Sequence, residues 1–111
     1  MSGAVQQGDV YWQVLAEDKK RPVLVMSRNS AIDFLEAVVV APLTKTILKV
    51  PSFVRFEDTT LGQVAVNLDV LYTVNKNELE GFVTRLSKEK LREVRDAIGF
   101  SLGFDDLEEE L

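Results

Sequence analysis

Short apolar runs alternate with polar turns over the first 86 residues of the chain. Runs such as 21–27 and 37–44 are too short for typical helices and rich in valine, which indicates β-strands. This pattern predicts six or seven strands, over residues 8–15, 21–27, 37–44, 52–56, 63–67, 72–74 and 82–86. Polar segments between them predict loops, and residues 28–34 predict one helical turn that Asn29 or Ser30 would cap.

The pattern changes after Ser87, where apolar residues recur at spacings of three and four. These residues are Leu91, Val94, Ala97, Ile98 and Leu102. Ser87 is a typical N-cap and Gly103 a typical C-terminal cap, so we predict an amphipathic helix between them. Several short strands and one late helix indicate an α+β protein dominated by a curled antiparallel sheet. We favour a small SH3-like β-barrel, although periodicity alone does not separate it from an OB-fold or a small sandwich.

The composition is that of one globular domain, with 111 residues of which 46% are hydrophobic and 28% charged. No apolar stretch approaches the ~20 residues that cross a bilayer, and the first residues carry no signal-peptide pattern. We therefore expect a cytoplasmic protein that does not act in a membrane. The absence of His and Cys excludes disulfides and a structural zinc site, and we expect neither a metal nor a cofactor.

The net charge of -5 is concentrated at the C-terminus. Residues 105–111 hold five of the 18 acids, and the remainder has 13 acids against 13 bases. We therefore divide the chain into a domain over residues 1–104 and an acidic tail over 105–111. A neutral body can still carry a basic patch, so the low net charge does not exclude a polyanionic ligand.

Arg21 and Thr44 are the candidates for catalysis. Arg21 opens one buried strand and Thr44 closes another, so neighbouring strands would bring a permanent positive charge and a hydroxyl group to one surface. That pair suits a phosphate better than a carbohydrate or a peptide. Pro22 keeps the backbone of Arg21 extended. Taken singly, each residue is equally well explained as an ordinary strand residue.

The segment after Thr44 is basic and is followed by an aromatic residue, a combination that suits single-stranded nucleic acid. We predict RNA contacts from Lys45, Thr46, Lys49, Phe53 and Arg55 here, and from Arg28, Asn29, Asn67 and Asp69 elsewhere. Phe53 would fit equally well in the core, and Asn67 and Asp69 would also fit as caps of a turn.

The order of these motifs resembles that of the MazF/PemK family of toxin endoribonucleases. The resemblance covers about residues 8–104 and is carried by GDVYW at 8–12, RPVLV at 21–25, VVVAPLT at 38–44, PSFV at 51–54, YTV at 72–74 with Lys76, the segment 82–86 with Ser87, and IGFSLG at 98–103. It implies a homodimeric SH3-like barrel that cleaves single-stranded RNA (mRNA, tRNA or rRNA) selectively at short sequences and without metal. It also implies a cognate antitoxin of the MazE type, whose acidic segment fills the RNA groove.

By position, Arg21 matches the catalytic arginine of the family and Thr44 its catalytic threonine. The implied reaction is attack by a ribose 2′-hydroxyl on the adjacent phosphate, which leaves a 2′,3′-cyclic phosphate and a 5′-hydroxyl end. Two segments depart from the family pattern. The long loop after the first strand shrinks to residues 16–20, so no general base is assigned, and a common glutamine is replaced near Val70.

Two other functions remain open on the sequence. The same barrel also carries toxins that are not enzymes and that bind a protein such as DNA gyrase. A general SH3-like interaction module is the third alternative. The pairing of Arg21 with Thr44 favours the nuclease, because a binding module has no need of that pair.

Overall fold

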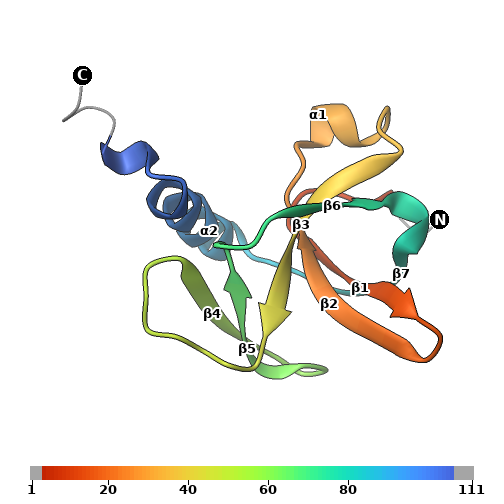
Figure 1. Ribbon diagram of the computed structural model, residues 1–111, viewed down its shortest axis with the longest axis horizontal. Coiled ribbons are helices and arrows are strands. Elements are labelled where there is room, and N and C mark those ends of the chain that lie inside the picture. The colour runs from red at the N-terminus through yellow and green to blue at the C-terminus, as the bar shows by residue number, and fades with distance from the viewer. Residues whose placement is uncertain (1–3, 107–111) are drawn as a thin grey trace.

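The computed structural model describes residues 4–106 and contains a curled sheet with one long helix packed against it (Figure 1). The strands are β1 (Asp9–Ala16), β2 (Lys19–Val25), β3 (Ala37–Thr44), β4 (Phe53–Asp58), β5 (Gly62–Asn67), β6 (Tyr72–Asn75) and β7 (Leu79–Arg85). The helices are α1 (Asn29–Ile32) and α2 (Lys88–Ser101), with 3-10 turns η1 (Lys76–Glu78) and η2 (Phe104–Asp106). Most of the predicted acidic tail lies outside the described residues, and Asp105 and Asp106 belong to η2.

Every strand pair in the sheet is antiparallel, in the order β4-β5-β3-β2-β1-β7, with β6 also paired to β3. Strand β3 therefore changes neighbours along one edge. It pairs with β6 through Val40 and with β5 from Leu43 onward. Pro42 lies between the two pairings, where a residue without a backbone N–H is tolerated because the ladder is interrupted there. The sheet curls into a half-barrel, which confirms the predicted α+β class.

Alternating side chains place apolar groups on both faces of the sheet. On β2, Leu24 contributes to a cluster under α2, whereas Val23 and Val25 contribute to a second cluster. The first cluster also includes Val94 and Ala97 of α2. The second contains Ile32 of α1, so the short helical turn covers this face near the C-terminal end of β2. Helix α2 therefore packs on one face of the sheet, and the shorter α1 packs on only part of the other face.

The helix boundaries follow the predicted signals at α2 but not at α1. The Ser87 hydroxyl accepts a hydrogen bond from the Lys90 backbone N–H at 3.1 Å, and Gly103 has a φ of +76° after the last turn. Both caps of α2 are confirmed. The predicted cap at Asn29 or Ser30 is wrong, because both lie inside α1 and the N-cap residue is Arg28, which makes no capping side-chain hydrogen bond. No helix among residues 4–106 is long and apolar enough to span a membrane.

The connection between β1 and β2 is shorter than the predicted loop over residues 16–20. The strands continue into it and leave a two-residue turn of Glu17 and Asp18, in which Asp18 has a φ of 64°. Aspartate tolerates this left-handed conformation better than most residues with a side chain. The tight turn keeps Arg21 on a paired strand, opposite Gln13 of β1.

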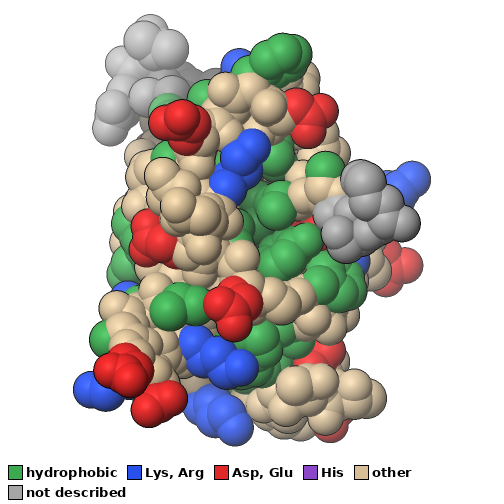
Figure 2. Space-filling model, turned by 90° about the vertical axis from the view of Figure 1, so that its right-hand side faces the viewer, with side chains coloured by type: hydrophobic (Ala, Val, Ile, Leu, Met, Phe, Trp, Pro, Cys, Tyr) green, Lys and Arg blue, Asp and Glu red, His purple; other side chains and the backbone are tan. Residues whose placement is uncertain are grey.

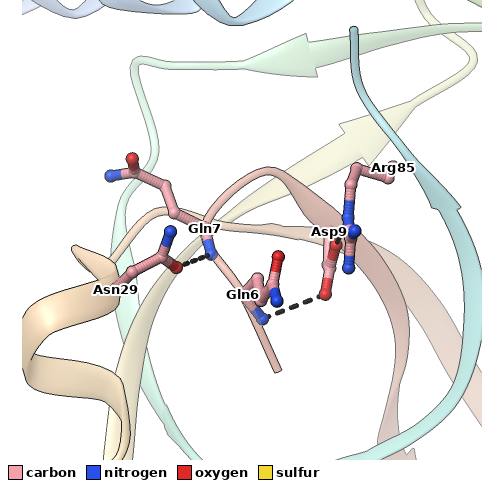
Figure 3. A network of polar contacts seen from close by, with 5 residues as sticks. All are labelled: Gln6, Gln7, Asp9, Asn29 and Arg85. Carbon is pink, nitrogen blue, oxygen red and sulfur yellow. Dashed lines mark hydrogen bonds and ion pairs between the residues drawn. The ribbon is translucent and has the colours of Figure 1, made fainter. Parts of the chain in front are cut away.

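A polar network connects residues 6–9 to the segment that follows β2 and to the end of β7 (Figure 3). The carboxylate of Asp9 is buried and accepts hydrogen bonds from Arg85 Nε at 2.6 Å and from the Gln6 backbone N–H at 2.9 Å. The hydrogen bond from Arg85 to Asp9 raises the pKa of Arg85. Asn29 Oδ1 accepts a hydrogen bond from the Gln7 backbone N–H at 2.8 Å. These contacts fix the chain where α1 begins.

Candidate active site

Arg21 projects from β2 beside two side chains that the sequence did not single out. Its guanidinium carbon lies 5.4 Å from the centre of the Tyr72 ring. The Tyr72 hydroxyl donates a hydrogen bond of 2.6 Å to Gln13 Oε1. Gln13 is buried, Tyr72 is half-buried and Arg21 is exposed. No ion pair involves Arg21 within residues 4–106, so its charge faces solvent without a carboxylate partner.

Thr44 lies at the last position of β3 and is half-buried. Its Oγ1 accepts a hydrogen bond from the Thr46 backbone N–H at 3.1 Å. The described residues provide no acceptor for the hydroxyl hydrogen, which leaves it free to be donated. A hydroxyl whose oxygen is held by the backbone is preorganised as a donor to an incoming phosphate oxygen.

The strand register relates Arg21 to Thr44. Val23 opposite Pro42 is the last pair between β2 and β3, and Arg21 and Thr44 lie two residues beyond it on their strands. Directly opposed residues of an antiparallel pair point to the same face of the sheet. By the alternation of side chains, Arg21 and Thr44 therefore point to one face of the sheet, and that they form one site stays a prediction.

The same face continues from Thr44 across two more strands. Thr44 is opposite Ala65 of β5, and Ala65 is opposite Arg55 of β4. At the usual strand spacing, Arg55 lies about 10 Å from Thr44. Phe53 is two residues from Arg55 on the same face and is opposite Asn67. The exposed residues Lys45, Thr46 and Lys49 are in the segment that leads from β3 to β4.

Asn67 and Asp69 bond within the chain. Asn67 Oδ1 accepts a hydrogen bond from the Asp69 backbone N–H at 3.0 Å, which caps the turn after β5. The carboxylate of Asp69 accepts hydrogen bonds from the hydroxyls of Ser52 at 2.6 Å and Ser101 at 2.9 Å. One carboxylate oxygen therefore ties Ser52, just before β4, to this turn, and the other ties α2 to it. Contact of either residue with RNA remains a prediction.

Arg28 and Asn29 lie at the other end of β2 from Arg21. The part of β2 from Arg21 to Val25 alone spans about 13 Å, and Arg28 follows three residues after the strand ends. Arg28 Nε donates a hydrogen bond of 3.1 Å to the Ser30 hydroxyl, and Asn29 bonds to Gln7. Figure 1 shows α1 at the far end of the sheet from the β1–β2 turn. The structure does not bring these two candidates together with Arg21 and Thr44.

The sequence contained only weak signals for Gln13 and Tyr72. Gln13 lies in the middle of the first strand, on the same side as Tyr11 and Leu15, and is polar where these two are largely apolar. Its partner Tyr72 is 59 positions away. A pattern of alternation indicates that Gln13 faces inward, but it does not identify the group that satisfies its side chain.

The fold is a curled antiparallel half-barrel with one C-terminal helix, and an exposed arginine and a threonine hydroxyl point to one of its faces. A family model described as a PemK-like, MazF-like toxin of a type II toxin–antitoxin system matches residues 6–102. The chain belongs to this family, which confirms the resemblance seen in the sequence.

Individual relatives can be aligned with this chain over nearly their whole length. The chain is 36% identical to the probable endoribonuclease MazF5 of Mycobacterium tuberculosis, with 88% of this chain and 93% of the relative covered. It is 30% identical to the endoribonuclease MazF of Staphylococcus saprophyticus, with 89% and 92% covered. A mycobacterial endoribonuclease solved in complex with its cognate antitoxin has a TM-score of 0.81 and 27% identity, with 90% of this chain and 96% of that chain covered.

Proposed function

We propose that this chain is a toxin endoribonuclease that cleaves single-stranded RNA with Arg21 and Thr44 as its catalytic residues. The predicted enzyme class is confirmed, because the curated relatives are named endoribonucleases. Those names favour cleavage of RNA over the alternative of a toxin that binds DNA gyrase. The assignment of the site is supported by the register of β2 and β3, because continuing it two residues beyond Val23 and Pro42 brings Arg21 and Thr44 to one face.

The reaction we propose uses the substrate's own 2′-hydroxyl as the nucleophile. Its oxygen forms a bond to phosphorus while the bond from phosphorus to the 5′-oxygen breaks. The 2′-hydroxyl proton passes to water, and the leaving oxygen takes a proton from Arg21 or from water. The products are a 2′,3′-cyclic phosphate and a 5′-hydroxyl end. The only acids in the short turn, Glu17 and Asp18, are exposed, and neither is assigned as a base.

Arg21 and Thr44 have separate roles in this scheme. Arg21 neutralises the charge that develops on the phosphoryl oxygens, and its exposed guanidinium carries no competing carboxylate within the described residues. Thr44 donates its free hydroxyl hydrogen to a phosphate oxygen and orients it. The RNA would continue from Thr44 across Ala65 towards Arg55, with the Phe53 ring available for stacking against a base.

Two partners belong to the proposal besides RNA. A solved relative binds its cognate antitoxin, and we expect this chain to have a MazE-like antitoxin that covers the same basic face. We also expect a homodimer. Figure 2 shows hydrophobic side chains gathered along one face, and Val14, Leu15 and Phe82 of β1 and β7 are exposed. Light scattering at micromolar concentration should return twice the chain mass, and a monomer mass would contradict the dimer. Because its substrate is cellular RNA, we place the protein in the cytoplasm.

The proposed nucleophile can be tested with chemically altered RNA. Purified protein is incubated in EDTA with an RNA and with the same RNA carrying 2′-O-methyl groups throughout. We expect cleavage of the first and binding without cleavage of the second. Cleavage of the methylated RNA would contradict attack by the 2′-hydroxyl.

A further inference from the structure

Three side chains from three strands meet beside the proposed catalytic centre. Gln13 of β1 and Arg21 of β2 are direct cross-strand partners, and Tyr72 of β6 contacts both. The Tyr72 hydroxyl to Gln13 Oε1 bond is 2.6 Å and links residues 59 positions apart. Gln13 is only 6% exposed, so this end of the group is fixed inside the sheet. The group therefore consists of a buried amide, an oriented ring and an exposed cation.

The contact between Tyr72 and Arg21 restricts the guanidinium without using up its hydrogen bonds. A cation over an aromatic ring is attracted to the ring face. The Arg21 guanidinium makes no ion pair within residues 4–106, and a contact with a ring face occupies none of its five N–H donors. An ion pair with a carboxylate would occupy two of them and neutralise the charge. The ring thus fixes the position of Arg21 and preserves its ability to bind a phosphate.

We propose that Tyr72, held by Gln13, is a positioning residue that orients Arg21 for cleavage. This inference rests on the proposed function of Arg21. Tyr72 acts through the guanidinium, and Gln13 acts through Tyr72. Burial raises the pKa of Tyr72, so its hydroxyl stays protonated and continues to donate to Gln13 at neutral pH.

The inference predicts which step of the reaction Tyr72 affects. Loss of the ring leaves a charged but mobile Arg21, so Tyr72→Leu should lower kcat by about 3- to 30-fold. KM should change less than about 2-fold, because attraction of RNA by the guanidinium charge does not depend on its orientation. Tyr72→Trp retains a ring face and should recover most of kcat. Tyr72→Phe retains the ring but loses its anchor to Gln13, and should be intermediate.

A double-mutant cycle with Arg21→Ala distinguishes this role from a structural one. With Arg21 intact, Tyr72→Leu slows single-turnover cleavage. In the Arg21→Ala background, the same change should have no further effect on the residual rate. Tyr11→Leu is the matched control, because Tyr11 is another half-buried tyrosine against the same apolar cluster. Tyr11→Leu should lower stability, and its effect on the rate should be the same in both backgrounds.

The outcomes separate the inference from the function it depends on. If Arg21→Ala is folded and fully active, the catalytic assignment is wrong and the inference falls with it. If Arg21→Ala is impaired but Tyr72→Leu has equal effects in both backgrounds, the catalytic assignment stands and the positioning role is overturned. Should Tyr72→Leu not fold, Tyr72→Phe and Gln13→Met replace it in the cycle, with the same criterion.

Discussion

The two ends of strand β2 differ in how their polar side chains are used. At the C-terminal end, Asn29, Gln7 and Ser27 hydrogen-bond to groups of the chain, and a buried Asp9 pairs with Arg85 nearby. At the N-terminal end, Arg21 lies over a ring and has no carboxylate partner within residues 4–106. Satisfied groups stabilise the fold, whereas an unpaired charge and a free donor are available to a ligand. This difference supports our proposal that the chemistry lies at the Arg21 end.

Removal of Arg21 should produce the largest effect on activity. Arg21→Ala should lower the single-turnover cleavage rate by roughly 10²–10³, as for the loss of one donor that stabilises transition-state charge. Thr44→Ala should also reduce the rate strongly while the protein remains folded, because Thr44 is at a strand end and outside both core clusters. Gel-based cleavage assays in EDTA measure both rates.

Arg92 provides the control for a loss of charge without a change at the site. It is an exposed arginine on α2, outside the face that carries Thr44. Arg92→Ala should retain the wild-type rate within about 2-fold. Equal losses for Arg92→Ala and Arg21→Ala would mean that general charge, and not position, determines activity.

Asp69 tests whether a residue with internal partners can also serve the site. Asp69→Ala removes the acceptor of two serine hydroxyls, and Ser52 is buried. We expect the free energy of unfolding to fall by about 1–3 kcal/mol, the usual cost of a buried group left without its partner. Urea denaturation gives this value. The cleavage rate per folded molecule should change little, and an inactive but fully stable variant would assign Asp69 to RNA instead.

Arg55 tests how far the RNA-binding face extends from Thr44. Arg55→Ala should weaken binding of a 2′-O-methyl RNA several-fold at low salt. The slope of log affinity against log salt should decrease by about 0.7, corresponding to one phosphate contact on a single strand. Fluorescence anisotropy over a salt series measures both quantities. An unchanged slope would place the RNA path away from β4.

The smallest expected effect is the pH dependence from Tyr72. Burial is the main cause that raises its pKa above 10.0, Arg21 opposes this and Glu78 adds to it. Because the pKa of Tyr72 is higher in the folded protein, the protonated hydroxyl contributes fully to stability below the pKa of tyrosine in the unfolded chain. This contribution is lost as the pH rises through the pKa of Tyr72 in the folded protein. Tyr72→Phe should therefore lose less stability than wild type between about pH 9 and 11. Identical pH profiles in urea denaturation would contradict this.

The sequence was informative about local structure and about the pair at the site. The alternation of short apolar runs with polar turns predicted the strands, and Ser87 and Gly103 predicted the two ends of α2. Arg21 at the start of one predicted strand and Thr44 at the end of another predicted that the two would share a surface. The sequence could not show that Tyr72 meets Gln13, because such a contact depends on the pairing of distant strands. The strand predicted over residues 21–27 already put Arg21 and Arg28 at opposite ends, but the sequence did not specify which end would face a ligand.

Analysis of the RNA ends from three proteins tests the central claim most directly. Wild type, Arg21→Ala and Arg28→Ala are incubated with mixed RNA in EDTA, and the new ends are identified chemically. We predict 2′,3′-cyclic phosphate and 5′-hydroxyl ends from wild type. Arg28→Ala should give the same ends with an equal kcat, because its loss of charge would raise only KM. Arg21→Ala should yield almost none. Equal yields from both variants, or 5′-phosphate ends from wild type, would contradict the assignment of chemistry to the Arg21 end of β2.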